Sequence, residues 1–115
     1  MTPSLDDLVS RYVAAAQAHA RAQLQSPVAA NAAHDVLVHA FHDIRDSGES
    51  GWACIRELTL HPDPTVRLWA ATHLLQNNPA LASTALLALE QLDGVVGFEA
   101  SIVLEEWRAG RLTWA

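Results

Sequence analysis

The chain has 115 residues, and 50% of them are hydrophobic, which is enough for one folded domain with an apolar core. Seven basic residues, all of them arginine, stand against 13 acidic residues and give a formal net charge of −6. This composition excludes a chain that is disordered throughout, and it argues against a nucleic-acid-binding protein, which would carry a basic surface. We therefore expect a protein partner with a basic or neutral surface.

The first helix is predicted to begin after Ser4, a good N-cap, and to run to about Gln25. Asp6 and Asp7 follow the cap, where the helix dipole favours negative charge. From Leu5 onwards, apolar residues recur at three- and four-residue spacing, which indicates one apolar stripe along an amphipathic helix.

The rest of the chain predicts five more helices with short connections and no strand. Ser26-Pro27 and Asn78-Pro79 each mark a helix start, because proline's missing N–H costs nothing in the first turn. The Ala- and Leu-rich composition also favours helices. The expected ranges are about 27–48, 51–60, 64–77, 79–93 and 95–109.

A shift of 30 residues aligns the second, fourth and sixth predicted helices in four columns without a gap. The match predicts helix pairs that cannot bury their apolar faces alone, which is the principle of an α-solenoid. Alternatively, any three Ala-rich amphipathic helices can be slid into partial register. The columns are Val36, Val66 and Val96; Val38, Leu68 and Phe98; Ala40, Ala70 and Ala100; and Ile44, Leu74 and Leu104.

The segment HPDPTVRLWAATHLL, from residue 61 to residue 75, resembles the HEAT-repeat pattern of an acidic turn residue, Val-Arg, a small pair and Leu-Leu. The resemblance implies that Asp63 and Arg67 link neighbouring repeats by polar contacts. The whole layout is similar to a family of small bacterial HEAT-like proteins whose last helix ends in Leu-x-x-Trp, here with Trp107 as a structural residue. Gly97 departs from the pattern, because it stands where the repeat has Arg67. The expected fold is an all-α, short HEAT/armadillo-like α-solenoid of six helices in three pairs, forming a single domain over residues 1–115.

An angle of 100° per residue gives each repeat-equivalent helix a core side and an outer side. The outer side is acidic, bears histidines and has Trp69 near its centre. Aromatic anchors ringed by charge are typical of protein interfaces, although a solvated face with one stray tryptophan would show the same pattern. The predicted partner-binding residues are Asp35, His39, His42, Asp43, Asp46, Trp69, His73, Glu99, Glu105 and Glu106.

Neither a metal site nor a catalytic centre is expected. His39 and Asp43 form an i,i+4 pair that could aim at one ion, but the chain has no His-Glu-x-x-His motif and no second ligand set. Cys54 is predicted to be a buried, inert thiol, and the sequence contains neither a Gly-x-Ser-x-Gly elbow nor a phosphate-binding loop. The chain is therefore expected to be no enzyme and to carry no cofactor.

The sequence also bears on the cellular setting. A single cysteine excludes an internal disulfide and fits a reducing, cytoplasmic compartment. The first residues lack the basic and apolar segments of a secretory signal. The longest apolar run, around residues 81–89, is well short of the ~20 residues that a membrane-spanning helix needs, so no membrane contact is expected.

The expected function is non-catalytic protein binding through the acidic outer side. The small size and the acidic charge resemble those of immunity proteins, which block the basic active site of a bacterial toxin. That role is the most specific expectation. An adaptor or scaffold subunit of a larger complex, and an accessory protein for cofactor attachment, are the alternatives that stay open.

Overall fold

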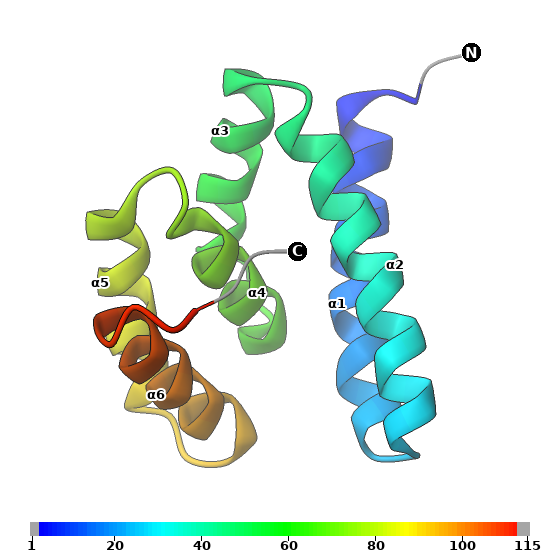
Figure 1. The fold of residues 1–115 in the computed structure, drawn as a ribbon. Coiled ribbons are helices and arrows are strands. Elements are labelled where there is room, and N and C mark those ends of the chain that lie inside the picture. The colour runs from blue at the N-terminus through cyan, green and yellow to red at the C-terminus, as the bar shows by residue number, and fades with distance from the viewer. Residues whose placement is uncertain (1–2, 113–115) are drawn as a thin grey trace. The chain divides into compact units, whose positions relative to one another are not determined.

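The computed structural model describes residues 3–112, and within this range it contains six α-helices and no strand (Figure 1). The all-α prediction is confirmed, and each predicted helix is found. Several predicted ends extend too far, because the chain leaves the helix in tight turns: after Leu74, the amides of Gln76 and Asn77 bond to carbonyls only three residues back. The helices are α1 (Leu5–Gln23), α2 (Pro27–Arg45), α3 (Glu49–Leu58), α4 (Pro64–Leu74), α5 (Pro79–Glu90) and α6 (Val95–Arg108).

Side-chain caps set the starts of four helices. Ser4 accepts a hydrogen bond from the Asp7 amide at 3.1 Å, and the Asp7 carboxylate accepts one from the Ser4 amide at 3.4 Å, which completes a capping box. Ser26, Asp63 and Asn78 cap α2, α4 and α5 in turn, and each is followed by a proline. The cap-and-proline prediction is therefore confirmed at Ser26 and Asn78.

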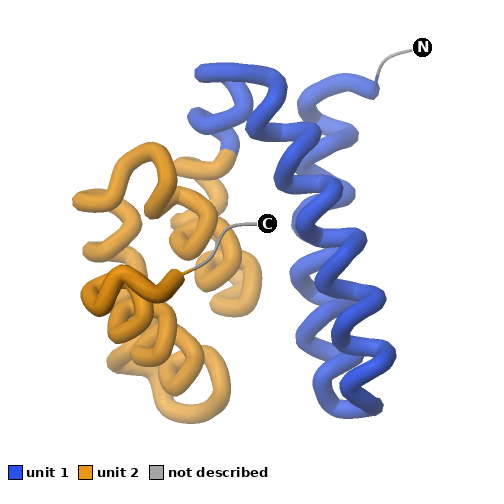
Figure 2. The backbone as a smooth tube through the Cα atoms, in the orientation of Figure 1, with its two compact units in different colours: residues 1–54 blue, residues 55–115 orange. Residues whose placement is uncertain are grey.

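The chain forms two compact units, residues 1–54 and residues 55–115 (Figure 2). In the first unit, α1 and α2 pack side by side as an antiparallel pair. Tyr12 from α1 and Leu37, Phe41 and Ile44 from α2 are buried in this pair. Trp52, in the first turns of α3, meets the Phe41 ring edge-on at 5.8 Å between centroids, so it covers the core of its own unit.

In the second unit, α4 packs against both α5 and α6, and α5 packs against α6. Val66, Leu74, Leu86 and Leu104 are buried among these helices. The buried residues of α4 span more than half of its circumference, as is typical of a helix that has neighbours on more than one side.

The repeat columns differ in burial. The column of Ala40, Ala70 and Ala100 is buried in all three helices, and so is the column of Ile44, Leu74 and Leu104. In the other two columns, the α4 residues Val66 and Leu68 are buried, whereas Val36 and Phe98 are exposed. Two columns therefore have matching environments. The solenoid arrangement and the single domain over residues 1–115 stay predictions.

Two helical glycines are required by close backbone approaches. A Cβ atom on Gly97 would overlap the carbonyl oxygen of Leu92, and a Cβ atom on Gly51 would overlap that of Ile44. The turn that leads into α6 thus passes directly against its first turn. This approach explains why Gly97 stands where the repeat pattern has an arginine.

We expect Gly97→Ala to lower the free energy of unfolding by about 1–3 kcal/mol, the usual cost of overpacking, although alanine is about 1 kcal/mol the better helix former. Urea unfolding followed by circular dichroism measures the change. Ser101→Ala in the same helix is the control and should stay within about 0.5 kcal/mol of the wild type. Unchanged or raised stability of Gly97→Ala would contradict the close approach.

Candidate protein-binding surfaces

The outer side of α2 presents its acids to solvent, as the sequence predicts. Asp35, His39, Asp43 and Asp46 are exposed and follow one side of the helix; we call these four residues the α2 ridge. His42, also predicted there, is half-buried, and its ring lies 5.9 Å from that of Phe41. The α2 ridge is therefore the best-formed part of the predicted binding side.

An open groove of about 530 Å³ runs beside the α2 ridge, between α1 and α2. Because alanines form much of its lining, few side-chain atoms fill the space above the helix contact. Val36 lines it as an exposed apolar residue, whereas Arg11, His39 and Asp43 are its polar lining. The remaining lining residues of this α1–α2 groove are Ala14, Ala15, Ala18 and Ala40.

Asp43 has a central place on this surface. It lines the α1–α2 groove, and together with Asp46 it also lines a second hollow of about 270 Å³ beside the start of α1. Asp46 lies 3.6 Å from the Nε atom of Arg45, and such an exposed pair contributes little stability. Among residues 3–112, no base forms an ion pair with Asp43, so its carboxylate is open to an incoming cation.

The outer side predicted for α4 is wrong at His73. His73 is only 7% exposed, and its ring lies 5.8 Å from that of Trp69, which is itself half-buried. The physical reason is the wide buried arc of α4 described above, which reaches His73 and leaves only a half-buried side. Trp69 is therefore not the exposed aromatic anchor that the helical register predicts.

The predicted acids of α6 fall into three environments. Glu105 is exposed and Glu99 is half-buried. Glu106 forms a two-pronged ion pair with Arg111, with Nε–Oε2 at 3.0 Å and Nη2–Oε1 at 3.1 Å. Its charge is therefore already paired within the chain, and Glu106 is a poor candidate for partner binding.

A helix-ending motif explains the pair. Gly110 has a φ of 72°, its amide bonds to the Trp107 carbonyl, and the Arg111 amide bonds to the Glu106 carbonyl at 2.9 Å, which together make a Schellman motif. This arrangement brings the Arg111 side chain back over Glu106. A glycine stop followed at once by arginine is the sequence signal that could have indicated the ion pair.

The residues expected to be structural lie as follows. The Asp63 carboxylate accepts a hydrogen bond from the Thr65 amide at 2.9 Å, and Arg67 donates from Nη1 to the His61 carbonyl at 3.0 Å. Both bonds join residues of the loop before α4 and of the first turn of α4. The polar link between repeats that the resemblance implies therefore stays a prediction. Trp107 is half-buried. Trp114, which the sequence allows either at the edge of the core or in solvent, lies outside the described residues.

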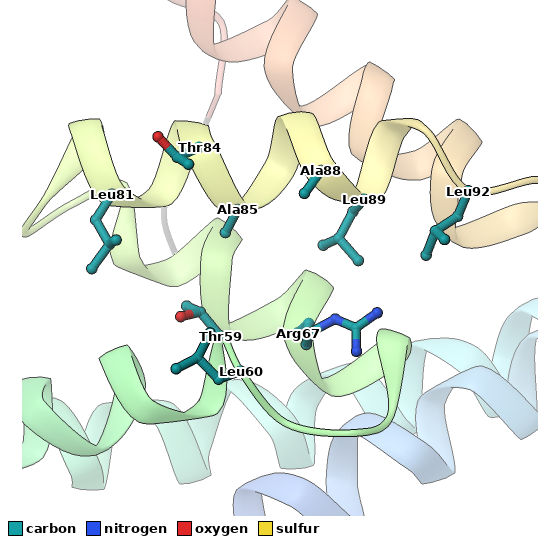
Figure 3. A pocket seen from close by; sticks show the side chains of 9 residues that line it. All are labelled: Thr59, Leu60, Arg67, Leu81, Thr84, Ala85, Ala88, Leu89 and Leu92. Carbon is teal, nitrogen blue, oxygen red and sulfur yellow. The ribbon is translucent and has the colours of Figure 1, made fainter.

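The second unit carries an apolar groove that the sequence did not predict. Its volume is about 380 Å³, and side chains of α5 point across it toward Thr59 and Leu60 (Figure 3). Leu60 is almost fully exposed, and Arg67 is the one charged residue among the described residues that line this groove. The lining residues are Thr59, Leu60, Arg67, Leu81, Thr84, Ala85, Ala88, Leu89 and Leu92.

Within residues 3–112, no three His, Cys, Asp or Glu side chains are grouped so that they could hold a metal ion. Cys54 is half-buried rather than buried as predicted, because it lies at the edge of the side of α3 on which Ile55 and Leu58 are buried. None of the helices in the described part of the chain combines the length and apolarity needed to cross a bilayer.

The comparisons with known proteins give no match: no family model, no curated protein and no solved structure is similar to this chain.

We expect the ion pair to be visible in the titration of Glu106. The hydrogen bond from Arg111 lowers the pKa of the Glu106 carboxyl below its ordinary value. The pair therefore stabilises the fold above the ordinary pKa of a glutamate, and this contribution is lost as the pH falls through the lowered pKa. Carboxyl-carbon NMR should show the pKa of Glu106 rising toward its ordinary value in Arg111→Ala.

Arg21→Ala is the matched control for this titration, because it removes an exposed arginine from the other unit. It should leave the pKa of Glu106 where the wild type has it. An equal pKa in Arg111→Ala and in the wild type would contradict the ion pair.

Proposed function

We propose that this chain is a non-catalytic protein-binding module whose partner docks on the α2 ridge and the adjoining α1–α2 groove. The observation that carries the proposal is the position of Asp43, an acid without an ion pair to any base of residues 3–112, beside an alanine-lined groove. An apolar furrow next to an open carboxylate suits a partner segment that carries aliphatic and basic side chains together.

An amphipathic helix is the partner segment that fits this surface best. Its aliphatic residues would pack on the alanines and on Val36, while lysine or arginine residues one turn away would reach Asp43 and Asp35. Arg11 lines the α1 side of the groove, where its guanidinium can bind an acidic side chain of the partner and so select the partner's orientation. The groove supplies contact area, and the acids supply attraction at a distance and specificity.

The specific form of this proposal is an immunity protein that blocks the basic active site of a toxin in the cytoplasm. The acids of the α2 ridge support it, because an acidic surface laid over a basic site excludes the substrate of that site. Net charge alone does not favour one unit: residues 1–54 have six acids and three arginines, and residues 55–115 have seven acids and four arginines. The proposal therefore rests on where the acids lie.

We further propose that the helices stack as a short HEAT-like α-solenoid. The two columns that are buried in α2, α4 and α6 alike support this arrangement. In such a stack, every second helix contributes to one continuous surface.

We expect Asp43→Lys to abolish capture of the partner, because it places a cation beside the groove that a basic segment must enter. The full-length chain, immobilised through a terminal tag, is exposed to a lysate of the source cell, and bound proteins are identified by mass spectrometry. Glu57→Lys is the matched control: it makes the same charge change at an exposed helical acid of the other unit. It should retain the protein that the wild type captures.

Ala14→Leu tests the groove separately from the charge. This residue is exposed and lines the groove, so a larger side chain fills the furrow with little disturbance of the core. We expect the same loss of capture as with Asp43→Lys. Capture of the same protein by all three variants would overturn the proposal, and a captured protein without a basic surface would overturn the immunity role.

A further inference from the structure

An apolar stripe on α6 faces solvent. Val95, Phe98 and Ile102 recur at three- and four-residue spacing, and they are 63%, 66% and 41% exposed. Glu105 continues this line one turn further along the helix and is also exposed. We call these four residues the α6 stripe. Contiguous apolar side chains of this kind commonly mark an interaction site.

The repeat register shows that the same face is covered elsewhere in the chain. Thirty residues earlier, the equivalents of Phe98 and Glu105 are Leu68 and Leu75, which are 4% and 1% exposed. The equivalents of Val95 and Ile102 are Thr65 and Thr72, which are half-buried. The face that is covered in part on α4 is therefore open on α6, where three of its four residues are apolar.

The two ends of the α6 stripe have opposite electrical character. At the N-terminal end, Gly94 has a φ of 93° and provides no side-chain cap, whereas α1, α2, α4 and α5 each begin with one. The first turn of α6 therefore carries the partial positive charge of a helix N-terminus without a carboxylate or hydroxyl from its own cap residue. At the other end of the stripe stands the negative charge of Glu105.

We propose that a second copy of this chain covers the α6 stripe, with the two α6 helices antiparallel about a twofold axis. An axis at the level of Ala100 places Phe98 against the partner's Ile102, because both lie two residues from that level. The same axis places Glu105 against the first turn of the partner helix at the partner's Val95, since both lie five residues from it. The stripe thus pairs its apolar residues with each other and its acid with a helix N-terminus, as a self-complementary twofold contact requires.

Other pairings of the same stripe are less favourable. A parallel pair would bring two Glu105 carboxylates together at one end and two uncapped helix N-termini together at the other. Docking of the stripe into the apolar groove at Leu60 of a neighbouring copy would bring Glu105 toward Arg67, but it would be head-to-tail and would build a ring or an open chain of molecules rather than a closed pair. In the antiparallel twofold pair, each residue of the stripe has one partner residue on the other copy.

The stripe is small, so the dimer is weak. Stable interfaces bury about 1,200–2,000 Å² in total, and one helix pair with three apolar residues on each side falls below that range. A dissociation constant of about 10–100 µM is the expected order of magnitude. This inference is independent of the proposed partner surface, which uses only residues of the unit 1–54.

Sedimentation equilibrium of the full chain from about 5 µM to about 500 µM tests the proposal. The average mass should rise from 12.5 kDa toward twice that value as the concentration increases. Phe98→Asp should weaken the dimer at least about 30-fold, because it places a charge at the centre of the contact, and Glu105→Lys should weaken it about 5- to 10-fold. Circular dichroism of both variants is the check on folding, and it should match the wild-type spectrum because the substituted residues are exposed.

Cysteine cross-linking tests the antiparallel register. In a Cys54→Ser background, an oxidised mixture of Val95→Cys and Glu105→Cys chains should form mixed dimers. Either variant alone should not, because equal positions would lie about 15 Å apart along the helix axis, too far for a disulfide.

Leu60→Asp is the matched control, since it places the same acid on the other apolar surface of the same unit. It should dimerise as the wild type does. A monomer at every concentration overturns the proposal, and so does a dimer that Phe98→Asp leaves intact. Loss of association in Leu60→Asp would show that a different contact joins the copies, and so would self-cross-linking of Val95→Cys alone. Either result overturns the symmetric antiparallel pair.

Discussion

Close approach of helix backbones is the constraint on which both units depend. Ala15 and Ala16 are buried on α1, and Ala40, Ala70 and Ala100 are buried at equivalent positions of α2, α4 and α6. Because the side chain of alanine is a single methyl group, two helices can approach closely at these positions. Backbone atoms and the larger side chains one turn away then fill the contact at high packing density. The same property shapes the surface. Where alanines continue to the edge of the α1–α2 contact, the helices leave an open furrow rather than a ridge.

Local chemistry made the helices predictable. The caps at Ser4, Ser26 and Asn78 each depend on a side chain and an amide three residues away, so they can be inferred without knowledge of the fold. The positions of the α2 acids could also be predicted, because α2 packs on one main neighbour, α1, and a helical wheel describes such a helix well.

The same wheel failed on α4 for a physical reason. A wheel assigns one core side and one outer side, but α4 has both α5 and α6 as neighbours, and its buried residues span more than half of the helix circumference. For this reason the wheel puts His73 on the outer side, whereas His73 is buried. Glu106 shows a second limit, because a charge counted in a sequence is not a free charge: a helix-ending turn brought Arg111 back to it. Neither the number of neighbours nor the turn geometry can be inferred from periodicity.

The acidic charge and the exposed apolar surface suit different kinds of recognition, and they lie on different helices, α2 and α6. The α2 ridge combines acids with a shallow furrow, an arrangement that repels another copy of the same acidic chain and attracts a basic partner. The α6 stripe has one acid and three apolar residues, so two copies can meet there with little like-charge repulsion at the contact. A helix that only had to close the fold would carry polar residues along its whole outer face. Phe98 occupies the position of the buried Leu68, yet it is an exposed apolar side chain, and contact with water gives no reason for such a residue. This is why we propose an interface on α6.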